Sequence, residues 1–385
     1  MKEDYSLLLI GQFYDNHSVR FVRNLKRFNP KAQIDYFTPV IRGKEIPSDY
    51  LEYFRAVEMV DFSHLFRYFP LLNKIEERYN WLNSFRSFSR DKHYDVVNIH
   101  YPRSINSLII PELHEIADSI VLTPWGSDVL RSTDKERRVL QRLYETADYV
   151  TGHGDRFTDE FMRIFNVPKQ KFIHVDLGTE TIDYIAEHKT EIGTKQAKQQ
   201  LGIEGSYAIT CGYNASPAQN HLKIIESIGR IKEQLPHNLV LLFPLTYPKN
   251  PDYVIQLKNA VDNYGLRALW FEQYMDLASL FILRQATDMF IHVQKTDANN
   301  ASLKEYLLLG KNCINGAWLQ YPDVEDNGRK PYYEVQSVDD LDANILKSYQ
   351  NGAKTLSPKA TRIIKSFGCK PAAVKWNQFF MSISK

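Results

Sequence analysis

Short apolar runs alternate with amphipathic helical stretches through the second half of the chain. Crossover helices join parallel strands, and strands that are buried on both faces read as continuous apolar runs. This alternation therefore predicts a parallel sheet covered by helices on both faces. The expected strands are 207–212, 239–243, 268–271, 289–293, 313–314 and 332–335, and the expected helices are 220–234, 253–264, 277–286, 303–309 and 339–349.

The first half of the chain follows the same rule less regularly. The segment 52–92 shows no strand pattern and is expected to be helical, as is the chain after residue 357. In that last part, Trp376, Phe379 and Phe380 form an apolar stripe that must be buried against another element. The expected strands are 5–10, 33–37, 96–100, 120–122, 149–151 and 172–175, and the clearest helices are 19–28 and 136–147.

The length of the chain, 385 residues, favours two domains over one. A polar stretch at 187–200, rich in Lys, Thr and Gln, is typical of a linker that contains a helix. We therefore predict an α/β protein of two Rossmann-like domains that face each other across a cleft. The first domain is expected to span 1–190 and the second 200–356, with the helix at about 357–385 packing back on the first.

Composition and charge narrow the class of protein. The net charge of +2 is too small to indicate a nucleic-acid partner. Cys211, Cys313 and Cys369 are far apart and lack metal-ligand spacing, so we expect buried thiols in a reducing compartment. The apolar run 7–10 predicts a first strand, not a signal peptide, and no run approaches the ~20 apolar residues of a membrane span. We expect a soluble, cytoplasmic protein that can still contact the inner face of a membrane.

The stretch 287–318 contains the clearest candidate site. An apolar strand leads into a polar loop and then a short apolar helix, with Asp297 and Glu305 eight residues apart. Ligands of open α/β sheets dock at the carboxyl ends of strands, and helix N-termini favour anions such as a diphosphate. An ionised carboxylate also accepts hydrogen bonds from paired hydroxyls. We interpret the stretch as a nucleotide-sugar site, with Glu305 on the ribose and Asp297 on the donor sugar or its diphosphate-linked face.

Four further residues belong to this candidate site. Asn299, Asn300 and Ser302 offer small polar groups near the helix start, which either cradle a phosphate or cap the helix. Lys295 is either a phosphate partner or a solvated loop lysine. Purely structural roles stay open for the two acids as well, because a Glu near a helix start suits the macrodipole and an Asp suits a loop or cap.

Several motifs match a known group of enzymes. The Asp297–Glu305 pair has the spacing of an acid-x7-acid motif, with Asp in place of the usual first Glu. The stretches 124–128 (Pro-Trp-Gly-Ser-Asp), 176–179 (Asp-Leu-Gly-Thr) and 201–203 (Leu-Gly-Ile) resemble that group's acceptor-side loop, interdomain turn and entry to the second domain. Over roughly the whole chain, the sequence resembles the large retaining family of GT-B glycosyltransferases, which includes many bacterial polysaccharide and lipid-linked sugar transferases.

The resemblance implies a GT-B fold and a transfer reaction. A nucleotide-diphosphate sugar would be held by the second domain, and its sugar would pass to an acceptor hydroxyl in the first. No cofactor besides the donor substrate is expected. No metal is expected either, because no Asp-x-Asp motif sits at a plausible strand end.

The first domain offers weaker candidates. Gly11 follows the first strand, and the resemblance implies that a loop at this position lies near the donor phosphates. The structural alternative is that the glycine is there only because a turn needs one. His100 would face the cleft, with His17 and His153 as rivals, and any single histidine can be structural. Asp128 would position the acceptor hydroxyl or act as a base, or else cap the helix that follows it.

One departure from the family concerns the charge that faces the donor diphosphate. The family carries an Arg just after the first glycine of the second domain and a Lys shortly afterwards. Here that glycine is Gly212, followed by 213–216 (Tyr-Asn-Ala-Ser), with 219–221 (Gln-Asn-His) where the Lys would fall. Both cations are missing, and losing one such donor costs ~3–4 kcal/mol of transition-state stabilisation. His221, if protonated, and Lys295 are the nearest substitutes in the sequence.

A second resemblance is narrower. The stretch 243–248 (Phe-Pro-Leu-Thr-Tyr-Pro) and the region through Pro322 are similar to bacterial transferases that add 4-acetamido-fucose (Fuc4NAc) to a lipid-linked enterobacterial glycan. Those enzymes use a deoxythymidine-diphosphate sugar. They would invert the configuration of the sugar, whereas the large family retains it, so the stereochemistry stays open.

The segment 52–92 mixes aromatic and basic residues. The mixture suits either an interfacial helix on an anionic membrane or a core-facing helix pair with a solvated basic face. In the first case, a lipid-linked acceptor is expected. The residues are Phe62, Phe66, Tyr68, Phe69, Trp81, Phe85 and Phe88, with Arg67, Lys74, Arg78, Arg86, Arg90 and Lys92.

These observations predict a cytoplasmic glycosyltransferase of bacterial surface glycan or lipid-linked oligosaccharide synthesis. Its partners would be a nucleotide-diphosphate sugar, a glycan or lipid-linked acceptor and an anionic membrane surface, but no nucleic acid. Because both family cations are missing, the alternative is a non-catalytic GT-B partner that binds a glycan or another transferase. A nucleotide-sugar epimerase of the same architecture is a third hypothesis.

Overall fold

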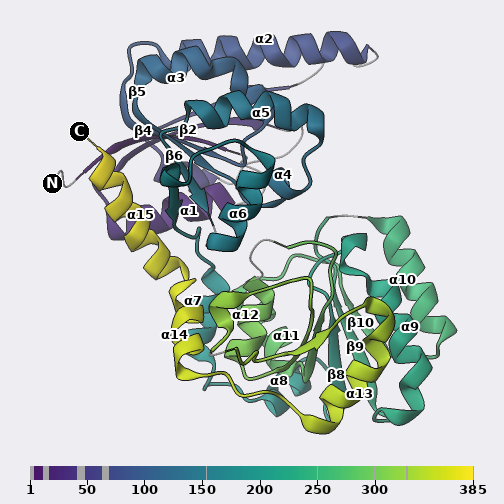
Figure 1. Ribbon diagram of the computed structural model, residues 1–385. Coiled ribbons are helices and arrows are strands. Elements are labelled where there is room, and N and C mark those ends of the chain that lie inside the picture. Colours follow the sequence, from purple (N-terminus) through teal and green to yellow (C-terminus); the bar gives the residue numbers. More distant parts are fainter. Residues whose placement is uncertain are drawn as a thin grey trace. The chain divides into compact units, whose positions relative to one another are not determined.

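The computed structural model describes residues 4–11, 17–40, 48–62, 69–152, 154–248, 250–297, 301–326 and 328–384. The chain forms two compact units (Figure 1). Unit 1 contains the chain up to Gly178 together with Cys369–Lys385, and unit 2 is Thr179–Gly368. Residues 179–190 and 357–368 thus belong to unit 2.

Unit 1 is built on a parallel sheet, which has seven strands among the described residues, in the order β3-β2-β1-β4-β5-β6-β7. Its strands are β1 (Ser6–Ile10), β2 (Gln33–Val40), β3 (Ala56–Asp61), β4 (Tyr94–His100), β5 (Ala117–Thr123), β6 (Tyr149–Gly152) and β7 (Phe172–His174). Its helices are α1 (His17–Phe28), η2 (Ser48–Tyr53), α2 (Pro70–Ser89), η3 (Ser104–Ile109), α3 (Ile110–Ile116), α4 (Ser127–Leu130), α5 (Asp134–Thr146), α6 (Asp155–Ile164), η4 (Lys169–Lys171) and α15 (Cys369–Ile383).

Unit 2 repeats the plan with a parallel sheet of six strands over the described ranges, in the order β10-β9-β8-β11-β12-β13. Its strands are β8 (Tyr207–Cys211), β9 (Leu239–Pro244), β10 (Ala268–Phe271), β11 (Met289–His292), β12 (Asn312–Gly316) and β13 (Tyr333–Val335). Its helices are α7 (Glu180–His188), α8 (Thr194–Gln200), η5 (Pro217–Gln219), α9 (His221–Ile231), η6 (Lys232–Gln234), α10 (Pro251–Asn263), α11 (Leu277–Ala286), α12 (Ala301–Leu308), η7 (Pro322–Val324), η8 (Val338–Asp340), α13 (Leu341–Asn351) and α14 (Pro358–Ser366).

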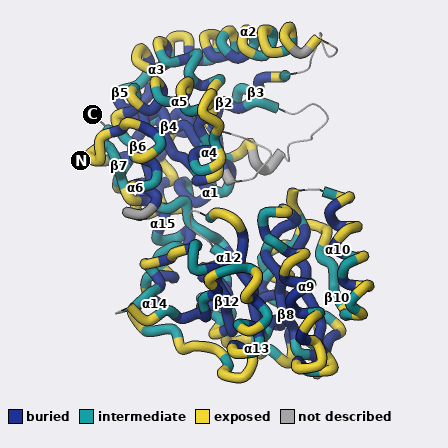
Figure 2. The backbone as a smooth tube through the Cα atoms, turned by 45° about the vertical axis from the view of Figure 1, so that its right-hand side comes forward, coloured by how far each residue is buried: buried dark blue, intermediate teal, exposed yellow. Residues whose placement is uncertain are grey.

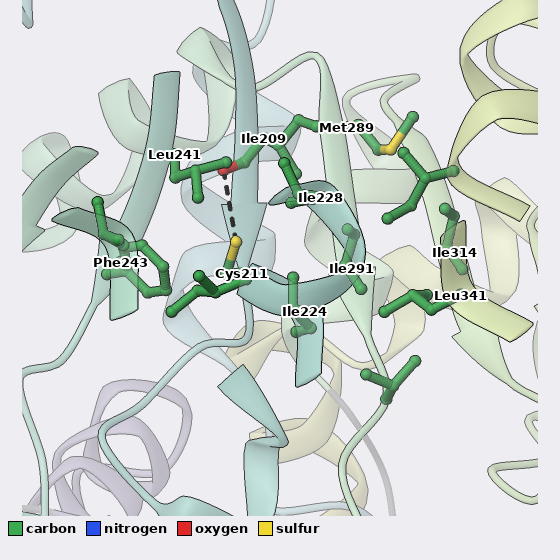
Figure 3. Packing of buried hydrophobic residues seen from close by; sticks show 14 of the residues in the cluster. Ile209, Cys211, Ile224, Ile228, Leu241, Phe243, Met289, Ile291, Ile314 and Leu341 are labelled. Atoms are coloured by element: carbon green, nitrogen blue, oxygen red, sulfur yellow. Dashed lines mark hydrogen bonds between the residues drawn. The ribbon is translucent and has the colours of Figure 1, made fainter. Parts of the chain in front are cut away.

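The core of unit 2 follows from the alternation of side chains along its strands. Ile209 and Leu241 point to the face that α9 covers with Ile224 and Ile228 (Figure 3). Neighbouring positions such as Val240 point to the opposite face and join a separate cluster. Because both faces are buried, central strands such as β9 read as continuous apolar runs. The strands expected in this half of the chain are all present.

The C-terminal helix α15 completes the core of unit 1. Its apolar stripe packs against α1, where the rings of Phe21 and Trp376 lie 5.0 Å apart, and Phe380 is fully buried. Tyr5 Oη donates to Asn377 Oδ1 at 2.7 Å and so ties α15 to the first strand. The stripe expected from the sequence is thus buried within unit 1.

The chain passes between the two units at two neighbouring glycines. Gly178 has φ +84°, and a Cβ there would lie 2.7 Å from the Cα of Cys369, so the crossing requires glycine. Thr179 pairs with Gly368 on the other side of the crossing. The turn 176–179, singled out in the sequence, therefore contains the boundary between unit 1 and unit 2.

One expected element was wrong. The segment 52–92 contains the strand β3, paired in parallel with β2 at the edge of the sheet. Edge strands carry polar and exposed positions, here Glu58 and the 36% exposed Met59, so their sequence lacks an apolar run. Within the described part of the chain, no helix combines the length with the apolar character that a membrane crossing demands.

Candidate functional site

The carboxyl edge of the unit 2 sheet gathers polar residues from three adjacent strands. β8, β11 and β12 lie side by side in parallel, so the segments that follow them emerge at the same edge. Gly212 follows β8, the loop containing Asp297 follows β11, and Trp318 follows β12. This edge is where ligands bind in open parallel sheets.

The turn between β8 and α9 is held tightly against the loop after β11. Gly212 has φ +63°, and a Cβ there would lie 2.8 Å from both Gln219 Oε1 and His221 Nε2, so only glycine fits. Asn220 Nδ2 donates to Val293 O at 2.6 Å, and the Lys295 N–H donates to Ala218 O at 2.9 Å. These hydrogen bonds therefore fix the turn after β8 and the loop after β11 to each other.

Gln294 is the centre of a buried amide network. Its Oε1 accepts from Tyr213 Oη at 3.1 Å and from Gln219 Nε2 at 2.8 Å, and its backbone carbonyl accepts from Trp318 Nε1 at 2.7 Å. Gln219 Oε1 and Gln294 Nε2 are buried and have no hydrogen-bond partner among the described residues. A buried polar atom without a partner costs ~1–3 kcal/mol, and such atoms are a mark of ligand sites.

His221 does not supply positive charge. It is fully buried in the network, and its Nδ1 lies 3.4 Å from Tyr253 Oη. Burial lowers the pKa of His221 to about 3, so the ring is neutral at pH 7. The expectation that a protonated His221 replaces a missing cation is therefore wrong.

Asp297 is anchored between β11 and β12. It accepts a hydrogen bond from Tyr321 Oη at 2.7 Å, and His292 Nε2 lies 3.9 Å from the same oxygen. The other ring nitrogen of His292 is 2.8 Å from Asn315 Oδ1. Burial lowers the pKa of His292 even though Asp297 opposes the shift, so this histidine is a neutral positioning group.

Glu305 and Arg284 form a buried ion pair. The side chains are 3% and 6% exposed, and Arg284 Nε donates to Glu305 Oε2. Arg284 also donates to Ser302 Oγ at 3.3 Å and lies over the ring of Tyr306. Burial by itself would lower the pKa of Arg284, but the groups that favour its charge, led by the negative Glu305, together have the larger effect, and the pKa of Arg284 is raised.

Sequence reasoning missed two residues of this edge. Arg284 is the single cation in the otherwise apolar α11, and a charge in such a helix must be paired. Tyr247 follows β9 and leaves 58% of its surface exposed, while its hydroxyl lies within electrostatic reach of Arg284 and Glu305. The pKa of Tyr247 is raised, because the surrounding protein desolvates the charged form of its hydroxyl, and Asn214 is a hydrogen-bonding neighbour that opposes the shift.

The remaining residues predicted for this site are spread more widely. Lys295 lies on the loop after β11 and is exposed. Ser302 is in the first turn of α12 and is tied to Arg284. Asn299 and Asn300 lie outside the described residues.

The unit 1 candidates also collect at one edge of a sheet, because β1, β4 and β5 are neighbours. Gly11 follows β1, and a Cβ there would lie 2.6 Å from Ser18 Oγ. His100 ends β4 and is packed among rings, with centroids 4.6 Å from Phe21 and 6.1 Å from Trp125. Asp128 lies in α4 after β5 and accepts from the Trp125 N–H at 2.9 Å, which holds the loop that precedes the helix.

Comparison with known proteins extends this picture. No family model and no curated protein matches the sequence. Anabaena HepE in complex with UDP and glucose superposes with a TM-score of 0.69 at 15% identity, over 98% of this chain and 100% of that chain. The chain has the GT-B fold.

Two further structures agree with this fold. Sucrose-phosphate synthase from Thermosynechococcus elongatus has a TM-score of 0.73 at 14% identity, over 98% of both chains. The lipopolysaccharide outer core galactosyltransferase WaaB has a TM-score of 0.65 at 11% identity, over 98% of this chain and 99% of that chain. The predicted class, two Rossmann-like α/β domains of GT-B type, is confirmed, whereas the resemblance to Fuc4NAc transferases stays a prediction.

Proposed function

We propose that the protein is a glycosyltransferase that moves a sugar from a nucleotide-diphosphate sugar to an acceptor hydroxyl. The observation that carries the proposal is the set of polar groups after the strands β8 and β11 of the unit 2 sheet, which includes Glu305, Asp297 and the Gln294 network. The GT-B neighbours support it, because one of them, HepE, was solved with UDP and with UDP-glucose.

In this proposal, Glu305 binds the ribose of the donor. Arg284 occupies Oε2 of the carboxylate, and a carboxylate accepts on both oxygens. Arg284 then serves as a positioning residue that fixes the orientation of the carboxylate. The exposed ring of Tyr247 beside this pair offers a flat surface for a nucleobase.

The diphosphate and the sugar fall nearer to the loop after β11. Gly212 has no side chain, so a phosphate can approach its backbone closely. The first turn of α12 offers backbone N–H groups to a phosphate. Lys295 and Ser302 supply a cation and a hydroxyl, and Asp297 contacts the sugar. Because Arg284 is already paired with Glu305, we assign Lys295 as the cation that binds the phosphates. The proposed reaction uses no metal ion and no separate cofactor.

Unit 1 is assigned to the acceptor. Asp128 and His100 lie at the carboxyl edge of its sheet and are our catalytic candidates there, with Asp297 on the donor side. Asp128 would receive the proton of the acceptor hydroxyl, and His100 would position that acceptor.

An exposed apolar face on α2 supports a lipid-linked acceptor of the kind used in surface glycan synthesis. Leu71, Ile75 and Tyr79 recur at helical spacing and are 79%, 63% and 68% exposed. Figure 2 shows many exposed positions along α2. Lys74 and Arg78 lie beside this stripe and are also exposed. Apolar residues flanked by cations suit the surface of an anionic membrane.

Liposome flotation tests the membrane assignment. With vesicles that contain anionic lipid at low salt, we expect the protein to float and the Leu71→Glu/Ile75→Glu variant to stay behind. Leu222→Glu/Ile255→Glu is the matched control, because both of its residues are exposed apolar positions on unit 2 helices. Failure of the wild-type protein to bind would remove the membrane from the proposal and leave the transfer reaction untouched.

Calorimetry with UDP and deoxythymidine diphosphate tests the donor site. Glu305→Ala alone would leave Arg284 buried without a partner, so the informative variant is Arg284→Met/Glu305→Leu, which removes both charges. We expect this double variant to fold and to lose nucleotide binding, whereas Glu226→Ala, at an exposed carboxylate of the same unit, binds normally. Unchanged affinity in the double variant would place the nucleotide elsewhere.

Incubation with nucleotide sugars separates the enzyme from its rivals. We expect slow donor hydrolysis without an acceptor and sugar transfer when an acceptor is supplied. Thermal stabilisation by a nucleotide sugar with neither hydrolysis nor transfer would identify a non-catalytic binding protein. An altered nucleotide sugar formed without any acceptor would identify an epimerase.

A further inference from the structure

A pocket lies in unit 2, away from the candidate donor site. It has a volume of about 490 Å³ and lies between the segment that leads into β13 and the segment that follows α13. Strands of a parallel sheet share their amino edge, and both segments lie at the amino end of β13. The pocket is therefore at the opposite edge of the sheet from Gly212 and Asp297.

The lining of the pocket carries more positive than negative charge. Arg329, Lys330 and Lys354 contribute positive charge, Glu334 is the one carboxylate of the lining within the described residues, and Thr355 adds a hydroxyl. Its volume is within the usual range of ~300–1,000 Å³ for small-molecule sites. The excess of positive charge selects for an anion.

Two of the cations, Lys330 and Lys354, are held in place by their neighbours. Lys330 Nζ lies 2.6 Å from Glu334 Oε1 and 3.7 Å from Glu325 Oε1. Lys354 Nζ donates to Tyr332 O at 2.9 Å and lies 4.7 Å from the centroid of the Tyr333 ring. Side chains that are fixed before binding lose little conformational entropy when a ligand arrives.

Mutual repulsion within the cluster favours a bound anion. Burial lowers the pKa of Lys354, and the nearby Lys347 and Lys330 lower it further, although Glu334 opposes them. An anion in the pocket would relieve that repulsion. Arg329 is exposed on a short turn, where its backbone pairs with Asp326, and its planar guanidinium can bind two oxygens of one ligand at once.

We propose that this pocket binds a phosphate-bearing ligand through Arg329, Lys354 and Thr355. A tetrahedral dianion can bind a guanidinium fork, an ammonium group and a hydroxyl, and all three line this pocket. The site is independent of the donor site, because the two lie at opposite edges of the sheet. Free phosphate, a sugar phosphate and a phospholipid headgroup share this chemistry.

Titration calorimetry with inorganic phosphate and with a hexose monophosphate tests the site. We expect binding by the wild-type protein, at least ten-fold weaker binding by Arg329→Gln/Lys354→Gln, and normal binding by Lys223→Gln/Lys258→Gln, which removes the same charge elsewhere on unit 2. Arg329→Gln alone guards against a folding defect, because its side chain is exposed. Arg284→Met/Glu305→Leu should bind phosphate normally, which separates this site from the donor site.

Vesicles with and without phosphatidic acid distinguish the sources. Binding to the vesicles that is lost in Arg329→Gln, without binding of soluble phosphates, assigns the pocket to a lipid headgroup. Binding of the hexose monophosphate more tightly than inorganic phosphate assigns it to a sugar phosphate. The proposal is overturned if no phosphate species binds, or if the pocket variant and the charge-matched control bind equally well.

Discussion

Breaking the Arg284–Glu305 pair should destabilise unit 2 strongly. Both side chains are almost fully buried, and Arg284 also holds Ser302 and covers the ring of Tyr306. Removing one partner of a buried pair leaves the other charge without compensation, which costs ~3–5 kcal/mol. Arg284→Met should therefore lower the free energy of unfolding of unit 2 by about 3–5 kcal/mol.

The double variant is expected to behave differently. Arg284→Met/Glu305→Leu removes both charges and keeps the volume apolar, so it should be near wild-type stability or above it. The exposed pair Lys258–Glu272 provides the control, because its nitrogen–oxygen distance is 2.6 Å but both side chains are 42% exposed. Lys258→Met should cost no more than ~1 kcal/mol.

Urea unfolding followed by circular dichroism measures these effects. Because the chain has two units, the curves should be fitted with separate transitions. A double-mutant cycle then gives the coupling between Arg284 and Glu305. A coupling near zero, or equal costs for Arg284→Met and Lys258→Met, would refute the reasoning that burial makes this pair dominant.

Three further predictions concern single residues. His221 has a pKa of about 3 in the folded protein, so between that pH and the ordinary value of 6.5 only the unfolded chain binds a proton at this residue. The free energy of unfolding should therefore fall as the pH is lowered through this range, by up to ~1.4 kcal/mol per pH unit. Urea unfolding at several pH values should show a less steep fall in His221→Gln. Burial lowers the pKa of Lys311 to about 8, so stability should rise between pH 8 and the ordinary value of 10.5, and thermal unfolding of Lys311→Met should lack that rise. Gly212→Ala should lower the free energy of unfolding by ~1–2 kcal/mol because of its left-handed backbone, and further because the new Cβ would clash with Gln219. Gly265→Ala is the control, because it has φ +60° and its Cβ would meet only a lysine Nζ at 3.7 Å. This variant should show the backbone cost alone in the same unfolding assay.

The regular part of the fold could be predicted because buried parallel strands have a plain signature. β9 and β11 are apolar at nearly every position, and α10 after β9 begins at Pro251 behind the capping Asn250. β3 lacked that signature, since an edge strand is exposed along one side. The aromatic and basic residues of 52–92 could not be sorted from sequence either. Trp81 and Phe85 are core residues, whereas Ile75 and Tyr79 on the same helix are exposed.

The candidate site could be located but not resolved into contacts. The strand ends placed Asp297 and Glu305 at one edge, because the topology of a parallel sheet brings carboxyl ends together. The partner of Glu305 comes from a different helix, and no local pattern shows that Arg284 reaches across from α11 to α12. The protonation of His221 likewise depended on burial, which only the packing of α9 against the sheet determines.

The most direct measurement is a crystal structure of the protein soaked with a nucleotide diphosphate such as UDP or deoxythymidine diphosphate. We predict a ribose within hydrogen-bond distance of the Glu305 carboxylate and phosphates beside Gly212 and the start of α12. A nucleotide bound away from this edge of the unit 2 sheet, with the Arg284–Glu305 pair untouched, would contradict the account.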